Sequence, residues 1–322
     1  MMNTWQNILK TELNSIFDPA ELQEGFVDLN HLALMAIAGP DAEKFLQGQL
    51  TCDVREVTAH QTRLAAHCNP KGRVITSFRL LRLAEVYYLQ LPHSMLEIGL
   101  TRLQKYAQFS KVKLHAVHED YLKLGAVGLK TEAQLRLYFG QLPANVDDMV
   151  FAREIFIIKL PGPSRYQLLG NKVAMAAVWQ ALNSDSSLYE TQAWDWLDIQ
   201  AGIASIYPQT SEIFTPHQLN YQLVNGVSFK KGCYTGQEVI TRMQYLGKLK
   251  QHMYRAELAS PALISPGDLV TLEPQGESCG EVVMAVNLAQ STQMLVALQD
   301  KALEHSLWLA DKPLKILTLP YF

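Results

Sequence analysis

A short apolar stretch followed by a turn and an amphipathic helix recurs four times in the first 183 residues of this chain. In each predicted helix the apolar residues return every three or four positions, which keeps them on one face. Two further pairs of predicted strands, at 63–82 and 149–162, have hairpin patterns and stand between these units. Because hairpins alternate with strand–helix units, the sequence predicts an α+β fold with largely antiparallel sheets. The four units cover residues 32–50, 86–109, 122–142 and 164–183.

The character of the sequence changes after Gly247, where helical periodicity fades. Short β-like runs separated by Gly and Pro follow, and they predict a small C-terminal β-barrel. Outside the repeated units we predict an N-terminal helix within 1–25 and a further helix at 184–203. The predicted domains are 1–246, with two similar mixed lobes at about 26–115 and 120–228 followed by a segment at 229–246, and a barrel at 247–322.

Length and composition narrow the class of protein. The 322 residues are enough for two or three domains, and 48% apolar with 18% charged residues is ordinary for a soluble globular chain. A net charge of −3 argues against a broad basic surface for nucleic acid. The first residues lack the apolar core of a secretory signal, and no stretch approaches the about 18 apolar residues of a membrane span. We therefore expect a cytoplasmic protein with no membrane partner.

The four cysteines include no C-x-x-C pair and fall in no Cys/His cluster. This pattern argues against a disulfide framework and a structural zinc site, so no bound metal is predicted. A Cys–His hydrolase is a weak alternative, because His217 and His252 stand at no motif spacing from Cys233.

The most specific stretch is FKKGCYTGQE, residues 229–238. Thr235 and Glu238 have capping-box spacing, so Thr235 is predicted to cap a helix. Cys233 would then lie just before the free N–H groups of a helix start, with Lys230 and Lys231 nearby, and both effects favour the thiolate. The alternative is a helix cap that contains a buried and inert cysteine.

This stretch resembles the signature of the YgfZ family, folate-binding proteins related to the T protein of the glycine cleavage system. Five other segments are similar in kind and order. The resemblance implies a T-protein-like fold of two mixed lobes and a C-terminal β-barrel around a channel that holds folate. It also implies a role in tRNA methylthiolation and in maintaining iron–sulfur enzymes. The five segments are 43–54, 64–74, 105–114, 199–203 and 214–222.

The resemblance also implies which residues form the sites. Cys233 falls on the family's functional cysteine, and Trp194 falls on a tryptophan that holds folate. The family's other folate-linked tryptophan falls on Leu32, so that aromatic side chain is missing here; Trp5 and Trp196 are candidates to replace it. Without the resemblance, a place in the core explains Trp194 better than a contact with a ligand does. The remaining signature residues carried over are Lys231, Gly232, Tyr234, Gly236, Gln237 and Glu238.

A second departure concerns chemistry. The T protein carries an acidic pair after its Asn-x-x-Gly turn, and Thr76 and Ser77 stand at those positions here. Neither side chain is ionised at neutral pH, so T-protein-type aminomethyl transfer is not expected.

Three hypotheses follow for the function. The first is an accessory protein that binds tetrahydrofolate or a derivative and acts with iron–sulfur enzymes that modify tRNA. The second is a folate-dependent one-carbon transferase that uses Glu238 or Asp53 as its base. The third is a module that presents tRNA through a weak contact with basic residues. The basic residues in question are Lys71, Arg73, Arg79, Arg82, Lys230, Lys231, Lys248 and Lys250.

Overall fold

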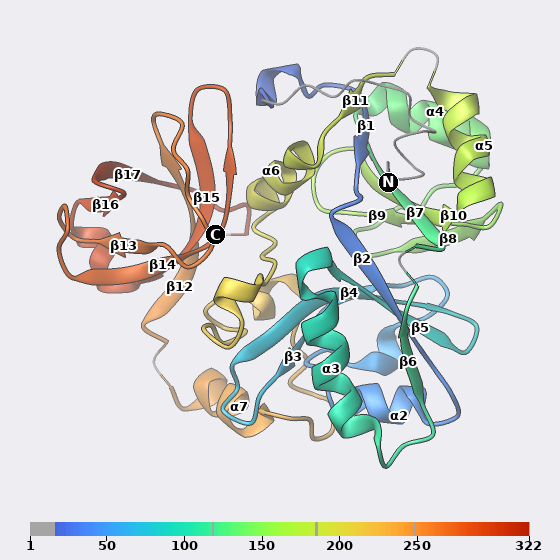
Figure 1. Cartoon of the computed structure of the whole chain (residues 1–322), viewed down its shortest axis with the longest axis horizontal. Helices are drawn as coiled ribbons and strands as arrows, with labels where there is room; N and C mark the ends of the chain where they lie inside the picture. The colour runs from blue at the N-terminus through green and yellow to red at the C-terminus, as the bar shows by residue number, and fades with distance from the viewer. Residues whose placement is uncertain (1–16, 118, 184–185, 248, 322) are drawn as a thin grey trace.

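The computed structural model describes residues 17–117, 119–183, 186–247 and 249–321, and it contains two β-sheets and a closed β-barrel. Figure 1 shows the barrel on one side of the molecule, with the two sheets stacked along the other side. Helix α6, Thr191–Ala201, lies between the barrel and one of the sheets. The predicted N-terminal helix falls mostly on residues 1–16, outside the described residues; a single 3-10 turn, Pro19–Glu21, follows them.

The six-stranded sheet has the order β11-β1-β7-β10-β9-β8. Helices α4, Leu129–Phe139, and α5, Lys172–Leu182, pack on its strands β7 and β10. The apolar residues of one sheet face and of both helices form a core of their own, which includes Phe26, Leu135 and Trp179. The strands are β1 Gly25–Asp28, β7 Tyr121–Val127, β8 Met149–Ala152, β9 Ile155–Lys159, β10 Arg165–Asn171 and β11 Leu188–Tyr189.

The five-stranded sheet has the order β3-β4-β5-β2-β6 and is antiparallel throughout. Helix α3, Leu96–Ala107, packs on β2 and β4, and the short helix α2, Ala42–Gln47, follows β2. A bulge between His67 and Cys68 shifts the register of the β3–β4 hairpin close to its turn. The strands are β2 Leu32–Ala38, β3 Arg63–Cys68, β4 Val74–Leu83, β5 Val86–Pro92 and β6 Lys113–Ala116.

The barrel closes in the order β12-β15-β14-β13-β16-β17, with β17 returning to β12. Alternate residues of its strands fill the interior, as at Ala256 and Leu258 on β12. Helix α7, Gln237–Tyr245, precedes it in the chain. The strands are β12 Gln251–Leu258, β13 Leu269–Thr271, β14 Ser278–Asn287, β15 Thr292–Gln299, β16 Leu307–Leu309 and β17 Lys312–Leu317.

The four predicted strand–helix units are all present, as β2–α2, β5–α3, β7–α4 and β10–α5. The predicted helix at 184–203 is partly wrong, because α6 begins only at Thr191 and Leu188–Tyr189 form strand β11. This two-residue strand pairs in parallel with β1, a contact between distant parts of the chain that local periodicity does not reveal. Residues 184–185 of that prediction lie outside the described residues.

Strand β1 belongs to the six-stranded sheet, since it pairs with β7 along its whole length. The chain then crosses to the five-stranded sheet at β2 and returns at β7. The first predicted lobe therefore contributes its first strand, β1, to the sheet of the second. We propose to keep the boundary between 1–246 and 247–322, because the first barrel strand begins at Gln251.

Candidate functional site

Helix α6 places Trp194 in the interior, where its side chain is only 2% exposed. The ring lies against strand β7 at Gly125, because a Cβ atom added there would come within 2.4 Å of it. The Arg165 guanidinium lies over the same ring, with its carbon 4.0 Å from the ring centroid. The Trp194 ring is thus held by packing against β7 and by the Arg165 side chain. The position of the guanidinium over the ring favours a cation–π interaction.

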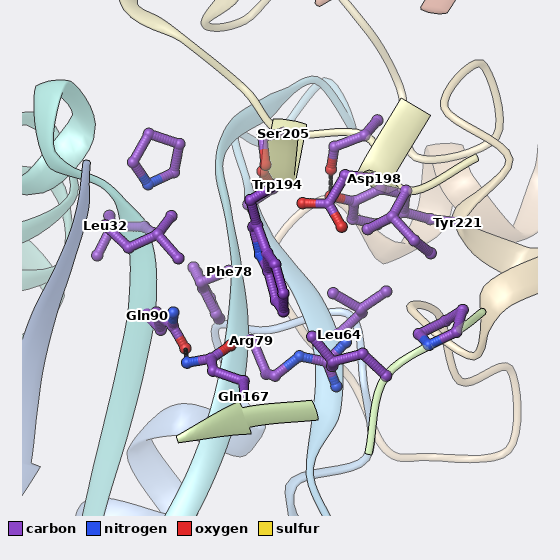
Figure 2. A pocket seen from close by; sticks show the side chains of 17 residues that line it. Leu32, Leu64, Phe78, Arg79, Gln90, Gln167, Trp194, Asp198, Ser205 and Tyr221 are labelled. Carbon is purple, nitrogen blue, oxygen red and sulfur yellow. Dashed lines mark hydrogen bonds between the residues drawn. The ribbon is translucent and has the colours of Figure 1, made fainter. Parts of the chain in front are cut away.

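Trp194 and Leu32, the two predicted folate residues, line one cavity of about 60 Å³. Figure 2 shows Trp194 at the centre of this lining, with Leu32 and Gln90 on one side and Asp198 on the other. Both sheets contribute to the cavity, through β2, β4 and β5 on one hand and β10 on the other. None of the signature residues 229–238 lines it.

Several polar side chains that line this cavity, or that bond to its lining residues, lack full hydrogen bonding. The Gln167 amide nitrogen donates to Gln90 Oε1 at 2.7 Å, whereas Gln90 Nε2 is buried and has no partner among the described residues. Arg165 Nη2 donates to Asp198 Oδ1 at 2.7 Å, but Arg165 Nε and Nη1 are also buried without a partner. Buried donors are rarely left unpaired in folded proteins, so these groups are suited to bind a ligand that supplies acceptors.

A second and larger cavity of about 660 Å³ adjoins the first. Pro161 lines both cavities, and the Arg165–Asp198 ion pair joins their linings. Trp196 lies on this side of α6, where its indole N–H donates to Gln293 Oε1 of the barrel at 3.1 Å. Trp5, the other candidate to replace the missing tryptophan, lies outside the described residues.

The two acidic-pair positions point in opposite directions, as neighbouring residues of strand β4 must. Ser77 lines the smaller cavity, and its hydroxyl accepts a hydrogen bond from the Ile206 N–H at 2.9 Å. Thr76 instead faces helix α3, where a Cβ on Gly99 would lie 3.4 Å from its methyl group. The carboxylate that the cavity does contain is that of Asp198.

Asp198 was not predicted as a cavity residue, although the sequence contains a signal for it. Asp198 stands four residues after Trp194, and residues four apart share one face of a helix. Gln90 and Gln167 were also missed, and here no sequence signal was available, because their strands belong to different sheets.

The signature lies elsewhere, in a loop that ends at α7. Cys233 is exposed, whereas the other three cysteines are buried. The predicted cap at Thr235 is wrong: Gly236 occupies the N-cap position in a left-handed conformation, and Thr235 Oγ1 donates to Gln49 Oε1. Because α7 begins at Gln237, Thr235 stands one residue too early to cap it.

The prediction that both lysines of the signature lie close to the Cys233 thiol is wrong for Lys231. The Lys231 side chain points inward, and Nζ donates to the carbonyl oxygens of Leu50 and Cys52 at 2.7 and 2.8 Å. Lys230 remains exposed. The candidate histidines are engaged in other contacts, His217 with Gln244 and His252 with Asp300 of the barrel segment.

Comparisons with known proteins agree with this architecture. The family model of the GCVT N-terminal domain matches residues 3–159. The tRNA-modifying protein YgfZ of Enterobacter sp. (strain 638) is 34% identical over 289 residues, which cover 88% of each chain. The chain belongs to the YgfZ family. The tRNA-modifying protein YgfZ of Colwellia psychrerythraea (strain 34H) is 32% identical over 237 residues, 73% of this chain and 72% of that one.

Among solved structures, the glycine cleavage system aminomethyltransferase T from Bartonella henselae superposes with a TM-score of 0.71. The match covers 93% of this chain and 86% of that one at 16% identity, and it confirms the predicted T-protein-like fold with its C-terminal barrel. This member of the YgfZ family therefore has the T-protein fold, with Thr76 and Ser77 at the positions where the resemblance to the T protein leads us to expect an acidic pair.

The basic groups considered for tRNA are more dispersed than the sequence suggests. Arg79 is buried and forms an ion pair with Asp147, and Lys231 is buried beneath the signature. Arg73 donates to Gln218 and to a backbone carbonyl. Lys248 lies outside the described residues. In this YgfZ-family chain, Lys71, Lys230 and Lys250 remain as exposed cations of that set.

The two bases considered for a transferase lie away from the cavity. Asp53 is bound by Arg55, with Oδ2 2.6 Å from the guanidinium, and this contact lowers the pKa of Asp53 to about 2. Glu238 is exposed in the first turn of α7. Within the described ranges, no group of three or more His, Cys, Asp or Glu side chains is arranged to hold a metal ion. None of the described helices has the length and apolar character needed to cross a bilayer.

Lys231 is expected to make the stability of the folded chain depend on pH. Burial lowers its pKa from 10.5 to about 8. Between these values the unfolded chain binds more protons than the folded chain, so the free energy of unfolding rises with pH, by on the order of 3 kcal/mol at most across the window. Urea unfolding of the wild type and Lys231→Met between about pH 7 and 10 measures this. We expect the free energy of unfolding of the wild type to rise relative to that of the variant as pH rises. The same change with pH in both proteins would contradict the assignment of this pH dependence to Lys231.

Proposed function

We propose that this chain is a folate-binding accessory protein that supports tRNA modification. The observation that carries the proposal is a pair of adjoining cavities, the smaller lined by Trp194 and Gln90 and the larger by Arg165, in which buried donors of Gln90 and Arg165 have no partner among the described residues. Membership of the YgfZ family supports the tRNA part, since both curated relatives are named tRNA-modifying proteins.

The residues present fit a reduced folate. A pteridine carries carbonyl and ring-nitrogen acceptors, which match the free N–H groups of Gln90 and Arg165, and N–H donors, which match the Asp198 carboxylate. The smaller cavity, which Trp194 and Gln90 line, is too small for such a ligand by itself. The adjoining cavity, which Arg165 lines, is within the range of about 300–1,000 Å³ that small-molecule sites occupy, so we propose that the ligand occupies both. Bound tetrahydrofolate would supply a carrier of one-carbon units.

Within this proposal, each side chain binds or orients the ligand. Trp194 and Leu32 form apolar walls of the cavity, while Gln90 and Gln167 act together as a hydrogen-bonding pair. Arg165 holds the Asp198 carboxylate in one orientation. Aminomethyl transfer is not part of the proposal, because Ser77 offers a hydroxyl where the T protein has a carboxylate.

Cys233 is the proposed functional thiol. It is exposed on a loop outside the folate cavity, so we propose that it serves contacts with a partner, an iron–sulfur enzyme that modifies tRNA, rather than chemistry on the folate itself. One cysteine cannot hold an iron–sulfur cluster by itself, since such clusters ordinarily take four ligands.

Tetrahydrofolate binding, measured by quenching of tryptophan fluorescence, tests the proposed cavity. We expect saturable binding to the wild type and about tenfold weaker binding to Gln90→Met, which loses the free buried donor. Gln104→Met makes the same change on the exposed surface of α3 and should bind as the wild type does. No saturable binding to the wild type, or equal affinity of Gln90→Met, would contradict the folate site.

A further inference from the structure

The signature loop is seated on the segment that follows helix α2. The Ser228 N–H donates to Thr51 O at 2.9 Å, and the Thr235 N–H donates to Gly48 O at 3.1 Å. Thr51 Oγ1 in turn donates to the Gly226 carbonyl at 2.6 Å. These contacts bracket the loop at both ends and join parts of the chain about 180 residues apart in sequence, since the fold brings distant segments together.

Lys231 lies between these two ends and points into the interior. Its side chain is 5% exposed, and its ammonium group donates to two backbone carbonyls, those of Leu50 and Cys52. The same group lies over the Tyr234 ring, 4.9 Å from the centroid. A buried ammonium is costly unless it is paired or hydrogen-bonded, so this site is built to accept one.

The neighbouring residues of the signature point the other way. Lys230, Gly232 and Cys233 are exposed, whereas Tyr234 is buried beside Lys231. A Cβ on Gly232 would meet nothing within 4 Å, so the space beside Cys233 is open. The signature therefore has an inward part, Lys231 and Tyr234, and an outward part, Lys230, Gly232 and Cys233.

The far end of the loop is tightly packed as well. Gly236 has a φ of +83°, and a Cβ there would lie 2.6 Å from the Asn69 carbonyl at the tip of the β3–β4 hairpin. A residue other than glycine would be strained and would displace the hairpin tip. The loop that carries Cys233 is thus held on the α2 side by Lys231 and on the hairpin side by Gly236.

We propose that Lys231 is a positioning residue: its ammonium fixes the signature loop on the Leu50 and Cys52 carbonyls and so presents Cys233 at the surface. This inference rests on the proposed role of Cys233 as the functional thiol. Lys231 then acts on where the thiol lies, because its donors are directed to carbonyls of another segment. Lys230, next in sequence but exposed, has no such role.

A nitroxide label on Cys233 reports the position of the loop without any ligand or activity. Because Cys52, Cys68 and Cys279 are buried, a thiol-specific label on the intact chain reacts at Cys233. We expect Lys231→Met to give a clearly more mobile electron paramagnetic resonance spectrum than the wild type. The amides of Ser228 and Thr235, which bracket the loop, should exchange with solvent at least about tenfold faster.

Lys230→Met is the matched control and should leave both the spectrum and the exchange rates unchanged. Lys231→Gln, which keeps a donor but no charge, should loosen the loop less than Lys231→Met and provides a second variant if the first does not fold. Unchanged mobility and exchange in both Lys231 variants, or an equal effect of Lys230→Met, would overturn the proposal. Since no folate, tRNA or partner is present, such a result would leave the proposed function to its own test.

Discussion

Replacing Trp194 with alanine is expected to lower the free energy of unfolding by about 3–5 kcal/mol, the range for deleting a large buried aromatic side chain. The ring is 2% exposed and lies against Gly125 and the Arg165 guanidinium, so its removal leaves a cavity in the interior and a buried charge without its aromatic contact. Urea unfolding at constant pH measures the loss, with the midpoint and slope compared between variants.

Trp196 provides the matched control, because it lies two residues away on the same helix and is only half-buried. Trp196→Ala loses the hydrogen bond from the indole N–H to Gln293, and its free energy of unfolding should fall by about 1–2 kcal/mol. Trp194→Phe, which keeps an aromatic ring in the wall, should fold well enough for its folate affinity to be measured. A loss in Trp194→Ala no larger than that in Trp196→Ala would mean that the packing at Gly125 is less tight than the structure indicates.

Much of the fold could be predicted from the sequence because its information is local. The four strand–helix units have apolar periodicities that change from two to about 3.6 residues at each turn, and all four are present. The barrel was equally readable from short β-like runs between turns. What could not be predicted were the pairings between distant segments, such as β1 with β7 and with the two-residue strand β11. No local pattern distinguishes these partners from any other exposed strand edge.

The candidate site likewise contains residues that could be predicted from the sequence and residues that could not. Trp194 and Leu32 were assigned through the family resemblance, and the structure brings them to one cavity. Gln90 and Gln167 reach that cavity from two different sheets, so their meeting depends on the packing of the whole chain.

Within the signature, the sequence indicated candidate residues but could not give the directions of their side chains. A loop has no periodicity that assigns residues to faces, so Lys230 and Lys231 look equivalent in sequence. In the structure one is exposed and the other is buried on two carbonyls. The capping box failed for a related reason, because Gly236 in a left-handed conformation moved the start of α7 by one residue.

Replacing Cys233 with serine is expected to reduce methylthio-tRNA, in cells that lack the native protein, to the level of cells carrying no copy at all. Serine is close in size, and Cys233 is exposed, so the substitution removes the thiol with little effect on packing. If the thiol makes the functional contact, activity is lost while the amount and thermal stability of the protein are unchanged. Quantification of modified nucleosides by mass spectrometry, with immunoblots of the same cells, measures both quantities.

Cys279→Ser is the control for loss of a thiol as such. Cys279 is buried in the barrel, and its Sγ lies 3.4 Å from the Val270 carbonyl, a contact that a serine hydroxyl can keep. This variant should modify tRNA as the wild type does, because the barrel thiol is closed to any partner. Full modification in cells carrying Cys233→Ser would instead show that the exposed thiol is dispensable. The signature would then act through its shape, and the open space beside Gly232 would become the part of the surface to which a partner binds.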